Sequence, residues 1–455
     1  MWGLIKNRLT ELDLKNLFQK RVIQNILTVA TITLFLKGIG FFKESIIAAN
    51  FGLSEVLDTF FIASLVPAFI SNVFIGAFKS VFIPNYIAEL KTGNSIASFQ
   101  AMGFFITGLV SLVFMIFAIL FTDVYLELVF PGHSYEYYSQ IKMQFYYLMP
   151  CIFLWGFSSL LGGLLNIDEE FKLTSYSSIF VPAAIILCIF LLDDLLGNMV
   201  LAIGTLIGST LTFLFLLWIS IQRKIIRLDF PDFSNTNARL MFAQVPAKVS
   251  SGFLTGMNSV VDQYFAAQLA VGSIAAINYG TKMPAFLVSL LLVALTNVLV
   301  PYFSKMAMEN RRQTFSTVFK MFKFMFIGAS ICALVGILMT DFLVELFFQR
   351  KEFTSDDTIL VSHIQKIFLI YAPFTVSGMI LVNFLTSINK NAFMAYLSFG
   401  ALILNIVLDY LLMMQYGILG IAFATTLVTI TKGFILFFYT YNLNKKEKNQ
   451  NLKDI

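Results

Sequence analysis

The residues of this sequence that are best suited to chemistry are charged side chains inside long apolar stretches. Lys37 and Glu44 stand seven positions apart in one stretch, so they lie on nearly the same face of an ideal helix. Lys43 directly precedes Glu44, and a later stretch carries Lys282. An ionisable group in the middle of a membrane costs about 2.5–3.5 kcal/mol, so each of these residues needs a polar partner or a water-filled cavity. Lysines that share a cavity would attract an anion.

A second polar stripe ends in a carboxylate. Lys248, Ser251, Thr255, Asn258 and Asp262 follow one another at steps of three or four residues, the spacing of one helix face. Further candidates for the same lining, from other apolar stretches, are Asn278 and the pair Asn405 and Asp409. A buried carboxylate titrates with its surroundings, so these positions could also bind a coupling cation or a proton. Asp58, near the start of a stretch, is expected to cap a helix or contact a loop.

Two segments of the chain repeat one pattern of glycine, carboxylate, alanine pair and proline. They cover residues 37–84 and 255–301. In each, a Pro-Ala-Phe begins 17 residues before a second proline, at Pro67 in the first copy and at Pro284 in the second, whose later proline is Pro301. The repeat predicts a duplicated fold with one lobe per copy and a site between the lobes. We expect Pro67, Pro284 and Pro301 to kink their helices and to act as hinges.

The composition is typical of an integral membrane protein. Hydrophobic residues make up 58% of the chain and charged residues only 13%, too little polar surface for a soluble protein. The apolar runs predict twelve transmembrane helices. The expected spans are residues 24–49, 56–84, 100–121, 141–165, 173–192, 198–221, 238–268, 274–303, 316–340, 360–387, 391–413 and 418–441.

These spans define the expected fold class and domains. The fold is all-α, with two six-helix lobes related by the internal repeat, V-shaped around a central cavity. The lobes cover residues 1–222 and 238–441, with a cytoplasmic connector at 223–237 and a cytoplasmic tail at 442–455.

Lysine and arginine in the short loops predict the orientation. The residues before the first span, the connector and the tail are basic, whereas the alternate loops are mostly acidic, for example at Asp123, Glu127 and Asp193. Both termini of this multi-pass protein are therefore expected on the cytoplasmic side of a cytoplasmic (inner) membrane. The net charge of +5 fits this topology and anionic lipids, and not nucleic acid.

Missing motifs argue against several chemistries. The chain has no GxxxxGK[ST] nucleotide loop, no HExxH and no GxSxG. Its three cysteines lie in apolar runs without CxxC spacing, and it has two histidines, so we expect neither disulfides nor a metal centre. The pattern favours a secondary transporter over an enzyme, with no organic cofactor.

Several stretches of the sequence also occur in a known family. They include FLKGIGFFKESIIAANFG at 35–52, LDTFFIASLVP at 57–67, GAFKSVFIP at 76–84, NSVVDQYFAAQLAVGSIAAINYGTKM at 258–283 and ELFFQRKEFTSDDT at 345–358. Together they resemble the MurJ/MviN lipid flippases of the multidrug/oligosaccharidyl-lipid/polysaccharide exporter superfamily. The resemblance implies that Lys37, Lys43 and Lys282 stand where that family has arginines. The family's arginines just after Pro67 are replaced here by the region of Ser71, and the family has fourteen spans where we count twelve.

The resemblance implies a flippase that moves a polyprenyl-diphosphate-linked saccharide from the inner to the outer leaflet by alternating access. The substrate is then either peptidoglycan lipid II or a surface-polysaccharide unit. Lys37, Lys43, Lys248 and Lys282 are expected to bind the diphosphate as point charges. Glu44 and Asp262 would hold the lysines in the empty cavity or bind a coupling cation, Na+ or H+. The membrane potential would also assist the export of an anion.

Two alternatives stay open. A cation-coupled multidrug exporter of the same superfamily would favour an acidic and aromatic lining, whereas this sequence has more lysine than carboxylate there. A non-transporting glycan-assembly membrane subunit would tolerate the loss of the charges. A membrane glycosyltransferase or polymerase is a weaker option, because only Arg350 with Asp356 and Asp357 resembles a catalytic cluster in an outer loop. The expected partners are a lipid-linked glycan and membrane lipids, with no nucleic acid, and the protein is expected to be a monomer.

Overall fold

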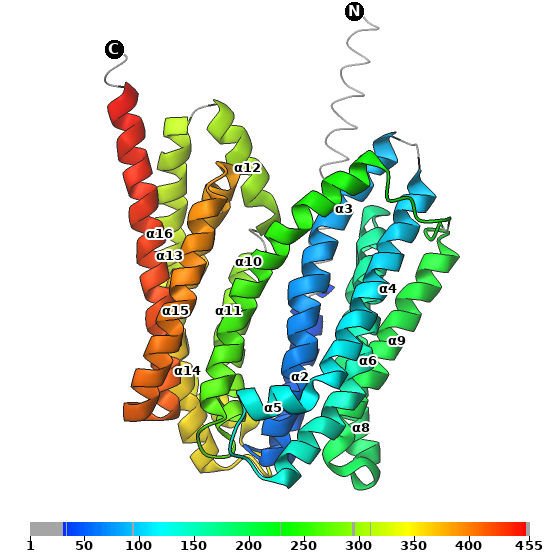
Figure 1. The fold of residues 1–455 in the computed structure, drawn as a ribbon. Helices are drawn as coiled ribbons and strands as arrows, with labels where there is room; N and C mark the ends of the chain where they lie inside the picture. The colour runs from blue at the N-terminus through cyan, green and yellow to red at the C-terminus, as the bar shows by residue number, and fades with distance from the viewer. Residues whose placement is uncertain are drawn as a thin grey trace, which may run out of the picture. The chain divides into compact units, whose positions relative to one another are not determined.

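The computed structural model describes residues 31–32, 34–92, 95–227, 229–293, 296–309 and 311–451. Within these residues all regular structure is helical (Figure 1). The first helix covers residues 34–51 in the described part, while its expected start at 24–30, the basic residues before it and the end of the tail at 452–455 lie outside the described residues. The later helices are α2 (Glu55–Ile70), η1 (Ser71–Ile75), α3 (Gly76–Thr92), α4 (Ile96–Leu120), α5 (Thr122–Val129), α6 (Tyr135–Ile167), α7 (Phe171–Tyr176), η2 (Ser177–Ile179), α8 (Phe180–Leu196), η3 (Gly197–Met199), α9 (Val200–Gln222), α10 (Thr236–Ala266), α11 (Ser273–Val293), α12 (Thr296–Glu309), α13 (Arg311–Phe348), α14 (Ser355–Ser387), α15 (Asn391–Tyr416) and α16 (Ile418–Asn451).

The helix positions confirm the all-α membrane fold. Eight described stretches are long and apolar enough to cross a membrane. One of them, residues 171–222, contains both the fifth and the sixth expected spans, as α8 and α9. The chain turns between them at Gly197, whose φ of +48° is one that residues with a side chain rarely adopt. The seventh expected span coincides with α10, and the eighth coincides with α11 and α12.

The chain divides into two compact units by its internal contacts. Of the described residues, unit 1 comprises those up to residue 46 together with 66–120 and 142–248, and unit 2 comprises 47–65, 121–141 and those from residue 249 onward. The helices α2, α6 and α10 each contribute to both units. The lobe and connector boundaries expected from the sequence stay predictions, because this division follows packing and not the internal repeat.

Aromatic side chains form the core of unit 1 between α3 and α4. Phe82 is buried, and its ring stacks on those of Tyr86 and Phe99 with centroids 5.7 and 5.5 Å away. Gly103 allows α4 to come this close, because a Cβ at that position would collide with the Phe82 ring. The same core includes Leu160 of α6. This packing fixes α3 relative to α4 and α6.

The segment after α9 is bonded to unit 1 and is not a free linker. Gln100 of α4 is fully buried; its amide donates to the Ile225 carbonyl at 3.1 Å, and its carbonyl accepts the Arg227 N–H. At the start of α10, the Asn237 amide donates to the Glu89 carboxylate at 2.6 Å. These bonds satisfy polar groups that burial would otherwise leave without a partner.

The centre of unit 2 is α14, which packs against α11, α12, α13 and α16. The ring of Phe384 on α14 meets those of Phe303 and Phe315 edge to face. On α13, by contrast, Phe324 is 76% exposed and Leu338 is 77% exposed. Such an outer face is suited to lipid tails, which are as apolar as these side chains.

The helix that contains Pro67 is irregular. Proline lacks an N–H and its ring crowds the preceding turn, so it disturbs the hydrogen bonds of an α-helix. Pro67 is followed by η1, a π-helical turn in which the Gly76 N–H donates to the carbonyl of Ser71, five residues earlier. Pro284 lies buried in α11, and Pro301 lies in α12. That these three prolines act as hinges stays a prediction.

Candidate functional site

Four polar side chains of unit 2 form one hydrogen-bonded group, which we call the acidic cluster. The Asn405 amide donates to Asp262 Oδ1 at 2.8 Å and to Asp409 Oδ2 at 2.6 Å. The Thr425 hydroxyl donates to Asp262 Oδ2 at 3.2 Å. Asn405 and Asp409 are almost completely buried. The acidic cluster thus attaches two carboxylates to one amide in the apolar interior of unit 2.

Three helices position the acidic cluster. Asn405 and Asp409 are four residues apart, so they share one face of α15, and α15 packs against α16, which carries Thr425. Asp262 comes from the second half of α10. Asp409 Oδ1 is buried and has no hydrogen-bond partner among the described residues.

The acidic cluster is suited to a positive charge. Two neighbouring buried carboxylates cannot both stay ionised without a proton or a cation between them. Carboxylate, amide and hydroxyl oxygens are the ligands that hard cations prefer, and the acidic cluster supplies all three kinds. The sequence pointed to Asp262 and Asp409 for coupling, whereas Thr425 was missed.

A lysine–carboxylate pair lies on the first helix, in unit 1. Lys43 Nζ is 2.7 Å from Glu44 Oε1, and the two side chains are only 19% and 12% exposed. Lys37 lies half-buried on the same helix. Glu44 thus forms an ion pair with Lys43. That Glu44 holds the lysines of an empty substrate cavity stays a prediction.

The remaining expected lining residues are on α10 and α11. Lys248 and Thr255 are exposed, and Lys282 is half-buried. The Asn278 amide donates to the Ile274 carbonyl at 2.9 Å, one turn back on α11. Asn258 Oδ1 is buried and has no partner among the described residues. Convergence of Lys37, Lys43, Lys248 and Lys282 on one substrate group stays a prediction.

Asp58 has a more specific role than its position near a helix start indicated. Its carboxylate accepts the Gly272 N–H at 2.7 Å and the Ala275 N–H at 2.8 Å. It therefore caps the N-terminus of α11, where backbone N–H groups have no partner within the helix. Nearby in sequence, the Ala49 carbonyl accepts the Glu352 N–H at 3.1 Å. These contacts join distant segments of the chain within unit 2.

Long apolar helices with charged, hydrogen-bonded side chains buried among them define a multi-pass membrane protein of the transporter class. The chain belongs to the family described as "Lipid II flippase MurJ", whose model matches residues 47–454. The resemblance stated from the sequence motifs is thereby confirmed.

Relatives and solved structures agree with this assignment. A protein of Buchnera aphidicola subsp. Baizongia pistaciae named "Probable lipid II flippase MurJ" is 24% identical over 426 residues, which cover 91% of this chain and 83% of the relative. A Vibrio cholerae protein of the same name is 24% identical over 440 residues, which cover 92% of this chain and 82% of the relative. Among solved structures, "Lipid II flippase MurJ, inward closed conformation" has a TM-score of 0.78 at 24% identity, over 91% of this chain and 87% of that one. An inward-facing multidrug resistance MATE family transporter has a TM-score of 0.77 at 12% identity, over 92% of this chain and 99% of that one. These two likenesses show the fold.

Proposed function

We propose that this protein moves lipid II from the inner to the outer leaflet of the cytoplasmic membrane by alternating access. The observation that carries the proposal is the match of the flippase family model to residues 47–454. The names of the relatives support peptidoglycan lipid II over a surface-polysaccharide unit. The protein acts as a transporter and not as a catalyst.

In this proposal the lysines bind the diphosphate of the substrate. Lys37, Lys43, Lys248 and Lys282 neutralise the diphosphate as point charges, without the fixed two-bond geometry of arginine. Glu44, 2.7 Å from Lys43, holds that ammonium group while no substrate is bound. When the substrate binds, its phosphate replaces Glu44 as the partner of Lys43. This lysine therefore has a counter-charge in the apolar interior both with and without substrate.

The test is complementation of a bacterium depleted of its own lipid II flippase, with lipid II measured on each face of the membrane. We expect the parent chain to restore growth and outward lipid II. The double variant Lys37→Ala with Lys282→Ala is expected to reduce the rate of export about tenfold or more, because each substitution removes a proposed charge-assisted contact with the diphosphate. Lys172→Ala, an exposed lysine on α7, is the matched control and is expected to export like the parent.

Three outcomes contradict this proposal in different ways. If the double variant exports like the parent, the lysine assignment is wrong. If depletion in the source organism leaves the cell wall normal but a surface glycan disappears, the substrate is a polysaccharide unit. If no lipid-linked intermediate accumulates on the inner face, drug export becomes the better hypothesis.

We infer that the acidic cluster is the coupling site of this transporter, for Na+ or H+. Support comes from the two carboxylates on one amide and from the unpartnered Asp409 Oδ1. A bound cation would tie α10 to α15 and α16, and its release would free α10 to move. The membrane potential adds to the driving force for export of an anion, and no organic cofactor is needed.

Three further points are part of the proposal. Both termini lie in the cytoplasm, the protein works as a monomer, and its partners are lipids and a lipid-linked glycan, not nucleic acid. The basic connector and the basic stretches near both termini support the orientation.

A further inference from the structure

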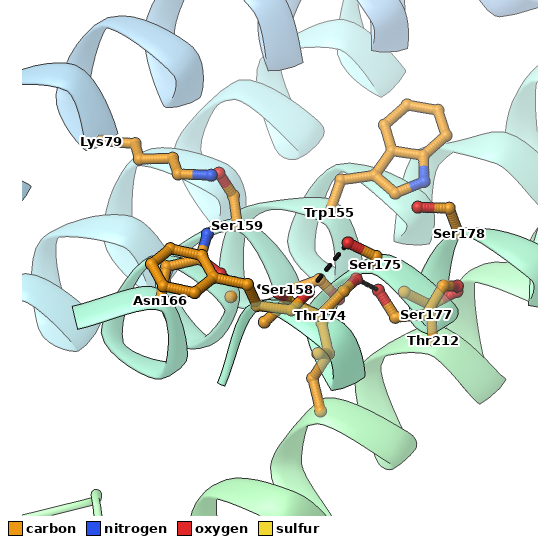
Figure 2. Close-up of a pocket in the computed structure, with 13 residues that line it drawn as sticks. Lys79, Trp155, Ser158, Ser159, Asn166, Thr174, Ser175, Ser177, Ser178 and Thr212 are labelled. Atoms are coloured by element: carbon orange, nitrogen blue, oxygen red, sulfur yellow. Dashed lines mark hydrogen bonds between the residues drawn. The ribbon is translucent and has the colours of Figure 1, made fainter. Parts of the chain in front are cut away.

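A cavity of about 470 Å³ lies inside unit 1, and neither the acidic cluster nor the Lys43–Glu44 pair lines it (Figure 2). Its walls come from α3, α6, α7, η2 and α9. One water needs only about 10–15 Å³ of such a volume, so the cavity has room for a small polar ligand together with several waters.

Lys79 is the charged residue of this cavity. It projects from α3 toward α6, and its stem lies against Gly163, where an added Cβ would be 3.6 Å from Lys79 Cε (Figure 2). The cavity lining includes no aspartate or glutamate, and Lys79 has no ion pair or hydrogen bond within the described part of the chain. A half-buried ammonium group without a counter-ion is stabilised when an anion binds beside it.

Hydroxyl groups dominate the rest of the lining. Seven of the thirteen lining residues are serine or threonine. Ser158 Oγ is buried and has no partner among the described residues, so it is available to a ligand. The Ser175 and Ser177 hydroxyls donate to backbone carbonyls at 2.8 and 2.7 Å, which leaves their oxygens able to accept. The lining therefore offers donors for an anion and acceptors for ligand hydroxyl groups.

An aromatic side chain supplies an apolar wall. The Trp155 indole N–H donates to Ser209 Oγ at 2.9 Å, which fixes the ring beside the cavity (Figure 2). Such a ring packs well against the carbon atoms of a small polyol. Trp155 also provides a built-in optical probe of the cavity.

The cavity opens beside α7. Phe171 and Ser178, which line it, are exposed, and the Thr174 hydroxyl holds α7 to α6 through Asn166 Oδ1 at 2.7 Å. At this end Glu170 is neutralised by Arg223, with 2.6 Å between their charged atoms. The mouth is therefore at the end of unit 1 from which the basic connector leaves.

We propose that this cavity binds a phosphate ester that carries hydroxyl groups. Lys79 neutralises the phosphate, and Ser158 and Ser159 donate to the phosphate oxygens. The lining hydroxyls that already donate to the backbone accept from the ligand's hydroxyl groups, and Trp155 covers the carbon chain. The headgroup of phosphatidylglycerol and free glycerol phosphate share this chemistry. None of the residues assigned above to diphosphate binding or to coupling lines this cavity.

The experiment uses Trp155 fluorescence in the purified full chain. A variant in which Trp155 is the only tryptophan (Trp2→Phe with Trp218→Phe) is titrated in detergent with glycerol 3-phosphate, with glycerol, and with phosphatidylglycerol in mixed micelles. We expect a saturable change with a phosphate ester and none with glycerol. Lys79→Gln in this background is expected to weaken binding about tenfold, the usual effect of losing one charge-assisted hydrogen bond. Lys172→Gln, on α7 but outside the lining, is the control and is expected to bind like the parent.

The outcomes separate the two sources. A saturable fluorescence change with glycerol 3-phosphate alone indicates a soluble ligand, and one with phosphatidylglycerol alone indicates a lipid headgroup. Either outcome supports the proposal. No saturable response to either ester, or parent-like binding by Lys79→Gln, would overturn it. Should Lys79→Gln lower the melting temperature, the double variant Ser158→Ala with Ser159→Ala keeps the charge. Unchanged binding by that variant would equally contradict the proposal.

Discussion

At the residue scale, Asn405 joins the two acids of the acidic cluster. Its amide donates to both carboxylates, at 2.8 and 2.6 Å, although an amide carries no charge to offset theirs. Two ionised carboxylates about 4 Å apart would repel each other by about 4 kcal/mol at an effective dielectric constant of about 20. The charge balance of the cluster therefore depends on what binds there.

The first residue-scale prediction concerns Asp409. If Na+ binds the acidic cluster, 100 mM NaCl should raise the melting temperature of the purified protein by several degrees relative to choline chloride, roughly the effect of a ligand far above its Kd. Asp409→Asn should abolish this rise, because it removes the charge that holds the ion. The matched control is Asp341→Asn on α13, which pairs with Lys366 at 2.7 Å and should keep the rise.

Proton coupling gives a different result. The parent then shows no preference for sodium, and proton uptake during transport is lost in Asp409→Asn. If neither cation affects the parent protein or its transport, the acidic cluster is only structural and the coupling proposal is wrong.

The sequence identified part of the acidic cluster. Asp262, Asn405 and Asp409 stand out because charged and amide side chains are rare in apolar runs. Thr425 did not, since a threonine on a helix ordinarily bonds to its own backbone, as Thr425 also does with the Ile421 carbonyl. The pairing itself spans 143 residues between Asp262 and Asn405, and no spacing rule reaches that far.

At the element scale, the N-terminus of α11 depends on a residue from another helix. The carboxylate of Asp58 lies 214 residues before its partner Gly272, yet it bonds to two N–H groups of this helix end. A carboxylate at a helix N-terminus is also favoured by the helix dipole. The backbone at Gly272 lies close against the segment that contains Leu53. Gly272 has a φ of +89°, and an added Cβ there would collide with the Leu53 carbonyl.

Replacement of Asp58 should therefore destabilise α11. We expect Asp58→Ala to lower the free energy of unfolding by about 1–3 kcal/mol, because two buried N–H groups lose their acceptor. Asp58→Asn, which keeps one acceptor oxygen, should lose less. Hydrogen exchange at the amides of Gly272 and Ala275 is the direct measurement, and thermal melting is the second.

The control for this prediction is Glu55→Ala, three residues earlier on α2. It should melt and exchange like the parent, since Glu55 makes no hydrogen bond or ion pair within the described residues. Unchanged exchange at Gly272 in Asp58→Ala would refute the capping role.

Hydropathy located the long helices but not the irregular elements. The runs of apolar residues predicted α4, α6 and α9 because a membrane demands length and apolarity. The short helix α5 is only eight residues long and was not predicted. The π-helical η1 was also missed. Its residue types do not differ from those of an ordinary apolar helix, and its hydrogen bonds depend on the backbone geometry after Pro67.

At the scale of the whole molecule, the composition was enough to define the class. A chain with 58% hydrophobic residues has no soluble alternative with enough polar surface, and the side chains exposed on α13 fit a lipid environment. The sequence could not show that residues 47–65 and 121–141 pack with the second half of the chain, as they do in unit 2. That packing depends on contacts such as Asp58 with α11, and not on any local pattern.

The orientation can be tested on the whole molecule. Because the loops expected inside are rich in lysine and arginine, green fluorescent protein fused after Asn451 should fluoresce, and alkaline phosphatase fused there should be inactive. Alkaline phosphatase inserted after Gly132, between α5 and α6, should be active instead. The reverse pattern of activities would show that the topology is inverted.

The π-helical turn at Ser71–Ile75 affects how the chain is compared with its relatives. Such a turn contains one residue more than the α-helical turn that it replaces. One extra residue rotates everything after it by about 100° relative to a regular helix. A relative without this insertion would match α3 only if a gap is opened between Pro67 and Gly76. An ungapped alignment with such a relative would assign Lys79 to the wrong helix face.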